Sequence, residues 1–164
     1  MKRLFAAIAV ASTVLLAPVA DADPLTYQKL QEVVTGMGHT PKPLPKDDGT
    51  PPSKFEITIV TTGFNVPIGV EVSPSGRYIW CSASLGESKL TGDDALAALR
   101  RIGSIQPTTF WITSKNYLMM GIAVDNRDVT AEDLKRIFDK LAADVGSTAD
   151  IWQKAAPATS TDPQ

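Results

Sequence analysis

The stretch KFEITIVTTGFNVPIGVEVSPSGRYIWCSAS, residues 54–84, decides the fold. Apolar and polar side chains alternate over residues 55–59 and again over residues 66–72, which is the period-two pattern of a half-buried strand. A third run, residues 77–84, is apolar on both faces. The turn sequences TGFN and PSG separate these runs and place proline and glycine where tight turns use them. The stretch therefore predicts an antiparallel meander of three strands.

A second group of strands follows further along the chain. The runs TTFWIT (108–113) and YLMMGIAV (117–124) are separated by a link of hairpin length. Between the meander and this hairpin, Thr91 and Asp94 provide the N-terminal capping residues of a short helix. Gly103 is expected to end that helix.

The last predicted helix has the clearest pattern in the sequence. Thr130 and Asp133 form a capping pair at its start, and Gly146 follows its last apolar residue. The apolar positions between them repeat at the spacing of a single helix face. They are Leu134, Ile137, Phe138, Leu141 and Val145. We expect this stripe to cover one face of the sheet.

The residues before the meander predict a helix and then a long exposed connection. Asp23 and Pro24 are read as an N-cap and a first-turn proline, and Gly36 and Gly38 as the stop signal. The next segment, HTPKPLPKDDGTPPS (39–53), holds five of the twelve prolines of the chain. We expect it to form neither a helix nor a strand, because proline lacks the backbone N–H that both use.

Together these elements predict an α+β fold, a two-layer sandwich. The order is helix, three strands, helix, two strands, helix, with the strands in a largely antiparallel five-stranded sheet. One domain is expected to cover residues 23–152, and the polar tail 153–164 is expected to be disordered.

Residues 1–22 carry the features of a secretory signal peptide. A basic pair precedes the apolar run 4–20, and the small residues Ala20 and Ala22 form a cleavage pattern. The run is too short for a good transmembrane helix, and a buried core helix is the alternative. We therefore expect cleavage after Ala22, an exported protein that is periplasmic or secreted, and no stable membrane insertion afterwards. The remaining chain is mildly acidic, which disfavours nucleic-acid binding.

No catalytic or metal-binding pattern is found in the sequence. The single histidine, His39, has no partners at metal-ligand spacing, and the single cysteine, Cys81, lies in an apolar strand. A nucleophilic pair of Cys81 and His39 is the alternative, but a strand interior lacks the electropositive setting that activates a thiol. Glycine motifs for nucleotides and the G-x-S-x-G elbow are absent. We expect a non-enzymatic protein with no cofactor and no bound metal.

Strict alternation of side chains predicts one aliphatic and one aromatic face for the sheet. If the aliphatic residues of the hairpin face the helices, the large aromatic residues must face the other way. The resulting patch consists of Tyr78, Trp80, Trp111, Tyr117 and Met119. An open patch of this kind is typical of a contact surface. One alternative is that the second helix, with Leu96, Leu99 and Ile102, covers the patch as a second core layer. The other is that the register is the other way round, so that the aromatic residues face the helices.

The chain also resembles a known family. The element order, with FEITIVTTGFNVPIGVEVSPSGRYIWCSASL (55–85) and FWITSKNYLMMGIAV (110–124), is similar to type III secretion chaperone-like proteins and in particular to the bacterial YbjN sensory-domain family. The resemblance runs from Leu25 to about Trp152. It implies a binding or chaperone-like module that often dimerises and has no catalytic residues. The export signal departs from the usual cytoplasmic members and argues against a role beside a cytosolic secretion substrate.

The sequence leaves two functions open. The first is an exported protein-binding or chaperone-like module that contacts another protein, or a second copy of itself in a homodimer, through the aromatic patch. The alternative is a periplasmic small-ligand carrier or sensor. Its pocket would lie between the first helix, the proline-rich segment and the sheet.

Overall fold

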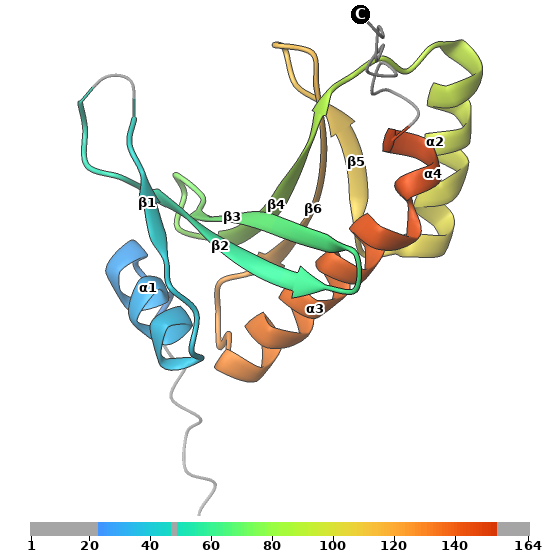
Figure 1. Cartoon of the computed structure of the whole chain (residues 1–164). Coiled ribbons are helices and arrows are strands. Elements are labelled where there is room, and N and C mark those ends of the chain that lie inside the picture. The colour runs from blue at the N-terminus through green and yellow to red at the C-terminus, as the bar shows by residue number, and fades with distance from the viewer. Residues whose placement is uncertain (1–22, 47–48, 154–164) are drawn as a thin grey trace, which may run out of the picture.

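The structure is a computed structural model that describes residues 23–46 and 49–153. Within these residues the strands form a single six-stranded sheet (Figure 1). The strand order is β1-β2-β3-β4-β6-β5, and every neighbouring pair is antiparallel. The strands are β1 (Lys42–Leu44), β2 (Lys54–Thr61), β3 (Phe64–Val72), β4 (Tyr78–Glu87), β5 (Thr109–Ile112) and β6 (Tyr117–Asp125). The α+β class and the antiparallel sheet are therefore confirmed, with one strand more than the sequence predicted.

The helices occupy different places around the sheet (Figure 1). The helix α3 (Ala131–Ser147) crosses one face and contacts β2, β3, β4 and β6. At the β1–β2 end lies α1 (Tyr27–Gly36), while α2 (Gly92–Ile105) and α4 (Ala149–Trp152) lie beside β5. No helix in the described part of the chain is long and apolar enough to cross a membrane. The predicted signal peptide and residues 154–164 of the predicted tail lie outside the described residues.

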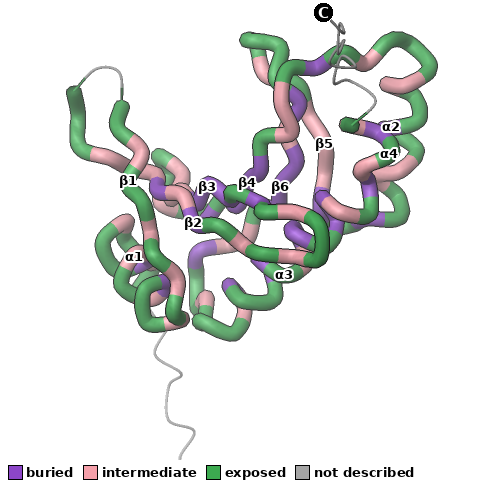
Figure 2. Tube along the Cα trace, viewed as in Figure 1, coloured by how far each residue is buried: buried purple, intermediate pink, exposed green. Residues whose placement is uncertain are grey.

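The core lies between α3 and the sheet, as the two apolar patterns predict. On α3 the stripe residues Leu134, Phe138 and Leu141 are buried, and on β2 the residues Phe55 and Ile57 are buried. Figure 2 shows this buried layer along the sheet and the facing side of α3. Burial of each large apolar side chain stabilises the fold by about 1.5–3 kcal/mol. The opposite face of the sheet is not part of this core.

The proline-rich segment contains a strand, so the expectation that it forms neither helix nor strand is wrong. Residues Lys42–Leu44 form β1, which pairs Lys42 with Glu56 and Leu44 with Lys54. A proline is tolerated here because β1 is an edge strand, where the missing N–H can face away from the sheet. The free edge of β2 thus captures a segment whose own sequence disfavours a strand.

Two helix boundaries also differ from the predicted ones. The N-cap of α1 is Thr26, whose hydroxyl accepts a hydrogen bond from the Lys29 backbone N–H at 3.3 Å, so Asp23 is not the cap. The helix α2 continues through Gly103 to Ile105. A single helical glycine costs only about 1 kcal/mol. The helix stops where Gln106 precedes Pro107, because a residue before proline avoids the helical conformation.

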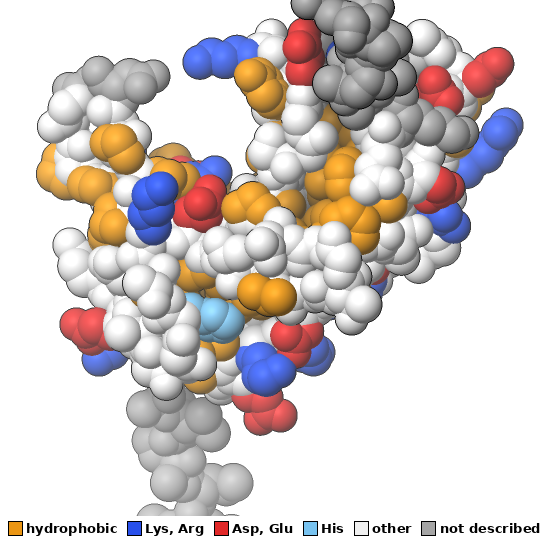
Figure 3. Space-filling model, in the orientation of Figure 1, with side chains coloured by type: hydrophobic (Ala, Val, Ile, Leu, Met, Phe, Trp, Pro, Cys, Tyr) orange, Lys and Arg blue, Asp and Glu red, His pale blue; other side chains and the backbone are white. Residues whose placement is uncertain are grey.

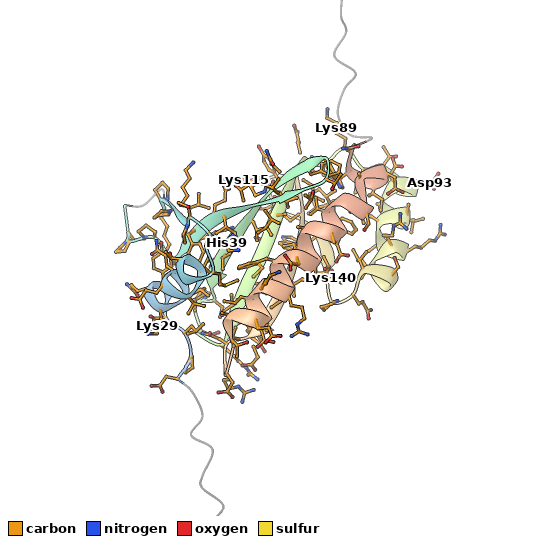
Figure 4. The ribbon with its side chains drawn as sticks, turned by 60° about the horizontal axis from the view of Figure 1, so that its bottom comes forward. Lys29, His39, Lys89, Asp93, Lys115 and Lys140 are labelled. Atoms are coloured by element: carbon orange, nitrogen blue, oxygen red, sulfur yellow. The ribbon has the colours of Figure 1, made fainter. Side chains whose placement is uncertain are left out.

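Two buried polar side chains connect segments that are distant in sequence. The Asp144 carboxylate on α3 accepts hydrogen bonds from the Thr108 hydroxyl and the Lys140 ammonium, and Lys140 also donates to the Ile105 carbonyl at 2.9 Å. Figure 4 shows Lys140 on α3. This network fixes the end of α2 and the start of β5 against α3. Because every member has a partner, the buried charge is compensated.

Asn126 holds the N-terminal segment in the same way. Its side-chain oxygen accepts from the Leu25 backbone N–H at 3.1 Å, and its side-chain nitrogen donates to the carbonyls of Leu25 and Gly76 at 2.9 and 2.8 Å. Asn126 is almost fully buried. The residues just after the predicted cleavage site are thus part of the folded structure.

Candidate functional site

The face of the sheet opposite α3, here called the open face, carries all five residues of the predicted patch. On β4, Tyr78 and Trp80 alternate with the buried Ile79 and Cys81. Trp80 is opposite Ala123 of β6, and side chains alternate along β6, so Met119 and Tyr117 lie on the same face as Trp80. Trp111 of β5 is opposite Met119 and lies on that face too. Figure 3 shows a hollow in the molecule on this side, between the chain around β1 and the β5–β6 side.

Three of the five residues form a cluster. The rings of Trp80 and Trp111 are 6.4 Å apart between centroids and are tilted at 68°, an edge-to-face geometry that favours aromatic pairs. Met119 is the direct cross-strand neighbour of Trp111. The cluster of Trp80, Met119 and Trp111 therefore spans the three neighbouring strands β4, β6 and β5 on the open face.

Small residues on β6 allow the two indoles to meet. Trp80 lies on one side of β6 and Trp111 on the other, and the β6 positions between them are Ala123 and Gly121. A Cβ atom added at Gly121 would lie 2.9 Å from the Trp111 ring and 2.6 Å from the Cys81 carbonyl oxygen. The cluster thus depends on a glycine that the aromatic pattern alone does not reveal.

The two tyrosines lie at opposite ends of the open face and do not join the cluster. Tyr78 pairs with Asp125 at one end of β6, and Tyr117 pairs with Glu87 at the other. Eight residues of strand correspond to about 26 Å. The Arg77 guanidinium lies 5.5 Å from the centroid of the Tyr78 ring. The predicted patch is therefore a central cluster with two separate aromatic residues.

The second helix does not cover the open face, so that alternative is wrong. The residues Tyr78, Trp80 and Tyr117 are 38%, 40% and 46% exposed, and Trp111 and Met119 are half-buried. The helix α2 packs against β5 and α4 instead. Its leucines Leu96 and Leu99 are 49% and 62% exposed. Both an aromatic sheet face and a leucine face of α2 are thus accessible.

A hollow of about 620 Å³ adjoins the Trp80–Trp111 cluster. Its polar lining includes Lys54 of β2, Glu71 of β3 and Ser82 of β4, none of which the sequence reasoning selected. Each lies at a position where a half-buried strand shows its polar side. Which polar positions meet depends on register between strands, and that register places Lys54 opposite Glu71 and Glu71 opposite Trp80.

A second hollow of about 540 Å³ lies near the predicted ligand pocket of the alternative function. It is lined by residues of β2, by the N-terminal half of α3, and by His39, which follows α1. The His39 ring packs edge-on against Phe138 at 5.8 Å. Figure 4 shows His39 beside α1. This contact gives His39 a packing role.

The chain's thiol is not arranged for nucleophilic chemistry. Cys81 is fully buried in the core, and burial raises its pKa to about 12, so the thiolate is not formed at neutral pH. The His39 ring packs edge-on against Phe138. Among the described residues, no three His, Cys, Asp or Glu side chains are grouped to hold a metal ion.

Comparison with known proteins places the fold. No protein-family model matches the chain, and no curated protein matches its sequence. A chain of the HopA1–SchA chaperone–effector complex matches with a TM-score of 0.53 and 12% identity, over 77% of this chain and 91% of that one. The likeness shows that this chain and that chain of the complex share a fold.

Two further solved structures are similar to a lower degree. The type III secretion chaperone SycH of Yersinia pestis, in complex with a fragment of YscM2, matches with a TM-score of 0.47 and 12% identity, over 74% of this chain and 97% of that one. The ExoU–SpcU heterodimer from the type III secretion system of Pseudomonas aeruginosa matches with a TM-score of 0.47 and 14% identity, over 58% and 81%.

Proposed function

We propose that this chain is an exported, non-enzymatic, chaperone-like module that binds other proteins through the open face. The observation that carries the proposal is the uncovered aromatic cluster of Trp80, Trp111 and Met119, flanked by Tyr78 and Tyr117. Aromatic residues and methionine are enriched at protein contacts because they bury much apolar area at low entropic cost. The likeness to a chain from a chaperone–effector complex supports the same function.

The predicted signal peptide supports the export part of the proposal. Leu25, three residues after Ala22, is anchored by Asn126, so cleavage after Ala22 would keep this anchored residue at the start of the chain. The proposal also keeps the resemblance to the YbjN family, with export as this chain's departure from it. Amino-terminal sequencing of the exported protein is expected to begin at Asp23.

The binding proposal is tested by suppression of aggregation. The mature protein, starting at Asp23, is mixed with a thermally unfolding model client, and light scattering is recorded. We expect the wild type to reduce scattering and the double variant Trp80→Ala/Trp111→Ala to lose most of that effect. Val60→Ala is the matched control, because Val60 is 78% exposed on the open face but lies outside the cluster.

The unfolding temperature of each variant separates loss of binding from loss of fold. Since Trp80 is 40% exposed, its removal should leave a cooperatively folded domain. Equal suppression by wild type and double variant would contradict the proposal. So would a wild-type protein that leaves client aggregation unchanged.

A homodimer is a second contact mode, and the exposed leucines of α2 favour it. The face of α2 that packs inward carries Ala98 and Ile105, while Leu96 and Leu99 face outward. An apolar helix face in this position would be buried by a second copy of the chain.

A further inference from the structure

The hollow on the open face has one charged side and one uncharged side. Its charged lining comes from β2 and β3, in Lys54 and Glu71. Its lining from β4, β5 and β6 has no charged residue and holds the two indoles. A ligand with charged groups at one end and an apolar group at the other would match this lining.

A row of residues with little or no side chain crosses the sheet at the hollow. Gly69 on β3, Ser82 on β4 and Gly121 on β6 are consecutive cross-strand partners, and Ser82 lines the hollow. The Lys54 side chain lies over Gly69, since a Cβ atom added there would lie 2.4 Å from its Cε and 3.0 Å from its Nζ. The ammonium therefore extends from β2 over β3, where the missing side chain of Gly69 leaves room for it.

Lys54 and Glu71 are adjacent yet do not neutralise each other by a direct contact. They are cross-strand partners, whose Cα atoms lie about 5 Å apart in an antiparallel pair. Ion pairs with N–O separations of 2.5–3.7 Å occur elsewhere in the described chain, but none joins these two residues. The Lys54 ammonium and the Glu71 carboxylate therefore line the hollow side by side without forming an ion pair with each other.

The indole of Trp80 lies next to this charged pair in the cross-strand row that runs from Lys54 through Glu71. Glu71 is the cross-strand partner of Trp80, and Trp80 contacts Trp111. Neighbouring strands are about 4.8 Å apart, so the charged pair and the indoles are separated by about one small side chain. This is the layout of a molecule with a carboxylate and an ammonium on one carbon and an apolar group beside them.

We propose that the hollow binds an apolar or aromatic α-amino acid as its zwitterion. Lys54 binds the α-carboxylate, Glu71 accepts hydrogen bonds from the α-ammonium, and the ligand side chain packs on Trp80 and Trp111. The closeness of Lys54 to Glu71 selects a free amino acid over a longer peptide, whose termini are further apart. This ligand site goes beyond protein binding by the open face and does not depend on it.

Isothermal titration of the mature protein with phenylalanine and its blocked derivatives tests the charge requirement. N-acetylphenylalanine keeps only the carboxylate, and phenylalanine amide keeps only the ammonium. We expect phenylalanine to bind in a saturable manner and each singly blocked derivative to bind about tenfold more weakly or worse, because each loses one charge-assisted contact. Equal heats for all three compounds would overturn the proposal.

Substitutions then assign each charge. Lys54→Met should lower the affinity for phenylalanine about tenfold and leave the affinity for phenylalanine amide, which has no carboxylate, unchanged. Glu71→Gln should likewise lower the affinity for phenylalanine about tenfold and leave the affinity for N-acetylphenylalanine, which has no ammonium, unchanged. The matched control is Lys29→Met/Glu32→Gln, which removes an exposed cation and anion on α1, outside the hollow. Phenylalanine affinity that is insensitive to Lys54→Met and Glu71→Gln would also overturn the proposal.

The result is distinguishable from that of the aggregation experiment. Lys54→Met and Glu71→Gln retain both indoles, so we expect them to suppress client aggregation like the wild type. Absence of saturable amino-acid binding, with aggregation suppression intact, would remove the ligand site and leave the protein-binding function standing.

Discussion

At Gly121 the backbone of β6 passes so close to β4 that no side chain can be added without movement. The Cys81 carbonyl would be 2.6 Å from an added Cβ atom, and it belongs to the backbone of a central strand, which cannot easily shift. The indole of Trp111 would also have to leave its place beside Trp80. Gly121 therefore links sheet stability to the shape of the aromatic cluster.

Gly121→Ala is expected to lower the free energy of unfolding by about 1–3 kcal/mol, the usual cost of overpacking. The near-ultraviolet circular dichroism of the tryptophan pair should change as the rings separate. Chemical denaturation and circular dichroism measure the two effects. Gly103→Ala is the control, since it meets open space within α2 and should raise the free energy of unfolding by about 0.5–1 kcal/mol. Similar effects of the two substitutions would contradict this account.

At the scale of single elements, α3 begins with a complete capping box. The Thr130 hydroxyl accepts from the Asp133 backbone N–H, and the Asp133 carboxylate accepts from the Thr130 backbone N–H. Hydrogen bonds from the hydroxyl and backbone of Thr130, and then from Arg136, lower the pKa of Asp133. The ionised carboxylate is thus the form that the folded state prefers.

This preference predicts a pH dependence. Because the pKa of Asp133 is lower in the folded protein than in the unfolded chain, its contribution is present above the unfolded value of about 4 and is lost as the pH falls through the folded value. We expect Asp133→Asn to destabilise the protein at pH 7 and to differ little from the wild type in strong acid. Thermal unfolding over this range measures the effect. A difference in stability that stays constant down to strong acid would contradict it.

Most elements could be predicted because their patterns are local. The alternation from Phe55 to Ile59 and the stripe from Leu134 to Val145 each lie within one element, and both are buried as predicted. The strand β1 could not be predicted, because Pro43 within it and Pro41 and Pro45 beside it disfavour a strand. Its pairing comes from the free edge of β2, which is a non-local cause. The cap at Thr26 was missed for a different reason, since Asp23–Pro24 offers an equally plausible local signal.

The site was predicted only in its aromatic part. Alternation within each strand placed Trp80 and Trp111 on one face, and the structure brings them into contact. The charged pair of Lys54 and Glu71 was missed because it exists only through register between β2 and β3. The position of the Lys54 ammonium depends further on Gly69, a residue without a side chain on the neighbouring strand.

At the scale of the whole molecule, the leucine face of α2 predicts self-association. The wild-type mature protein is expected to be a dimer in solution, because Leu96 and Leu99 are exposed on a packed helix. The variant Leu96→Glu/Leu99→Glu should be a monomer with an unchanged unfolding temperature, since neither leucine contributes to the core. Light scattering coupled to size exclusion measures the mass. A monomeric wild type would contradict the dimer.

The central claim is that client proteins contact the aromatic cluster on the open face. Oxidative footprinting of the three tryptophans, read by mass spectrometry with and without an unfolding client, tests it most directly. We expect the client to protect Trp80 and Trp111 and to leave Trp152 unchanged, because the Trp152 ring packs against Phe64 and its indole N–H donates to the Val145 carbonyl, away from the open face. Bound client with Trp80 and Trp111 oxidised as fast as in the free protein would contradict the claim.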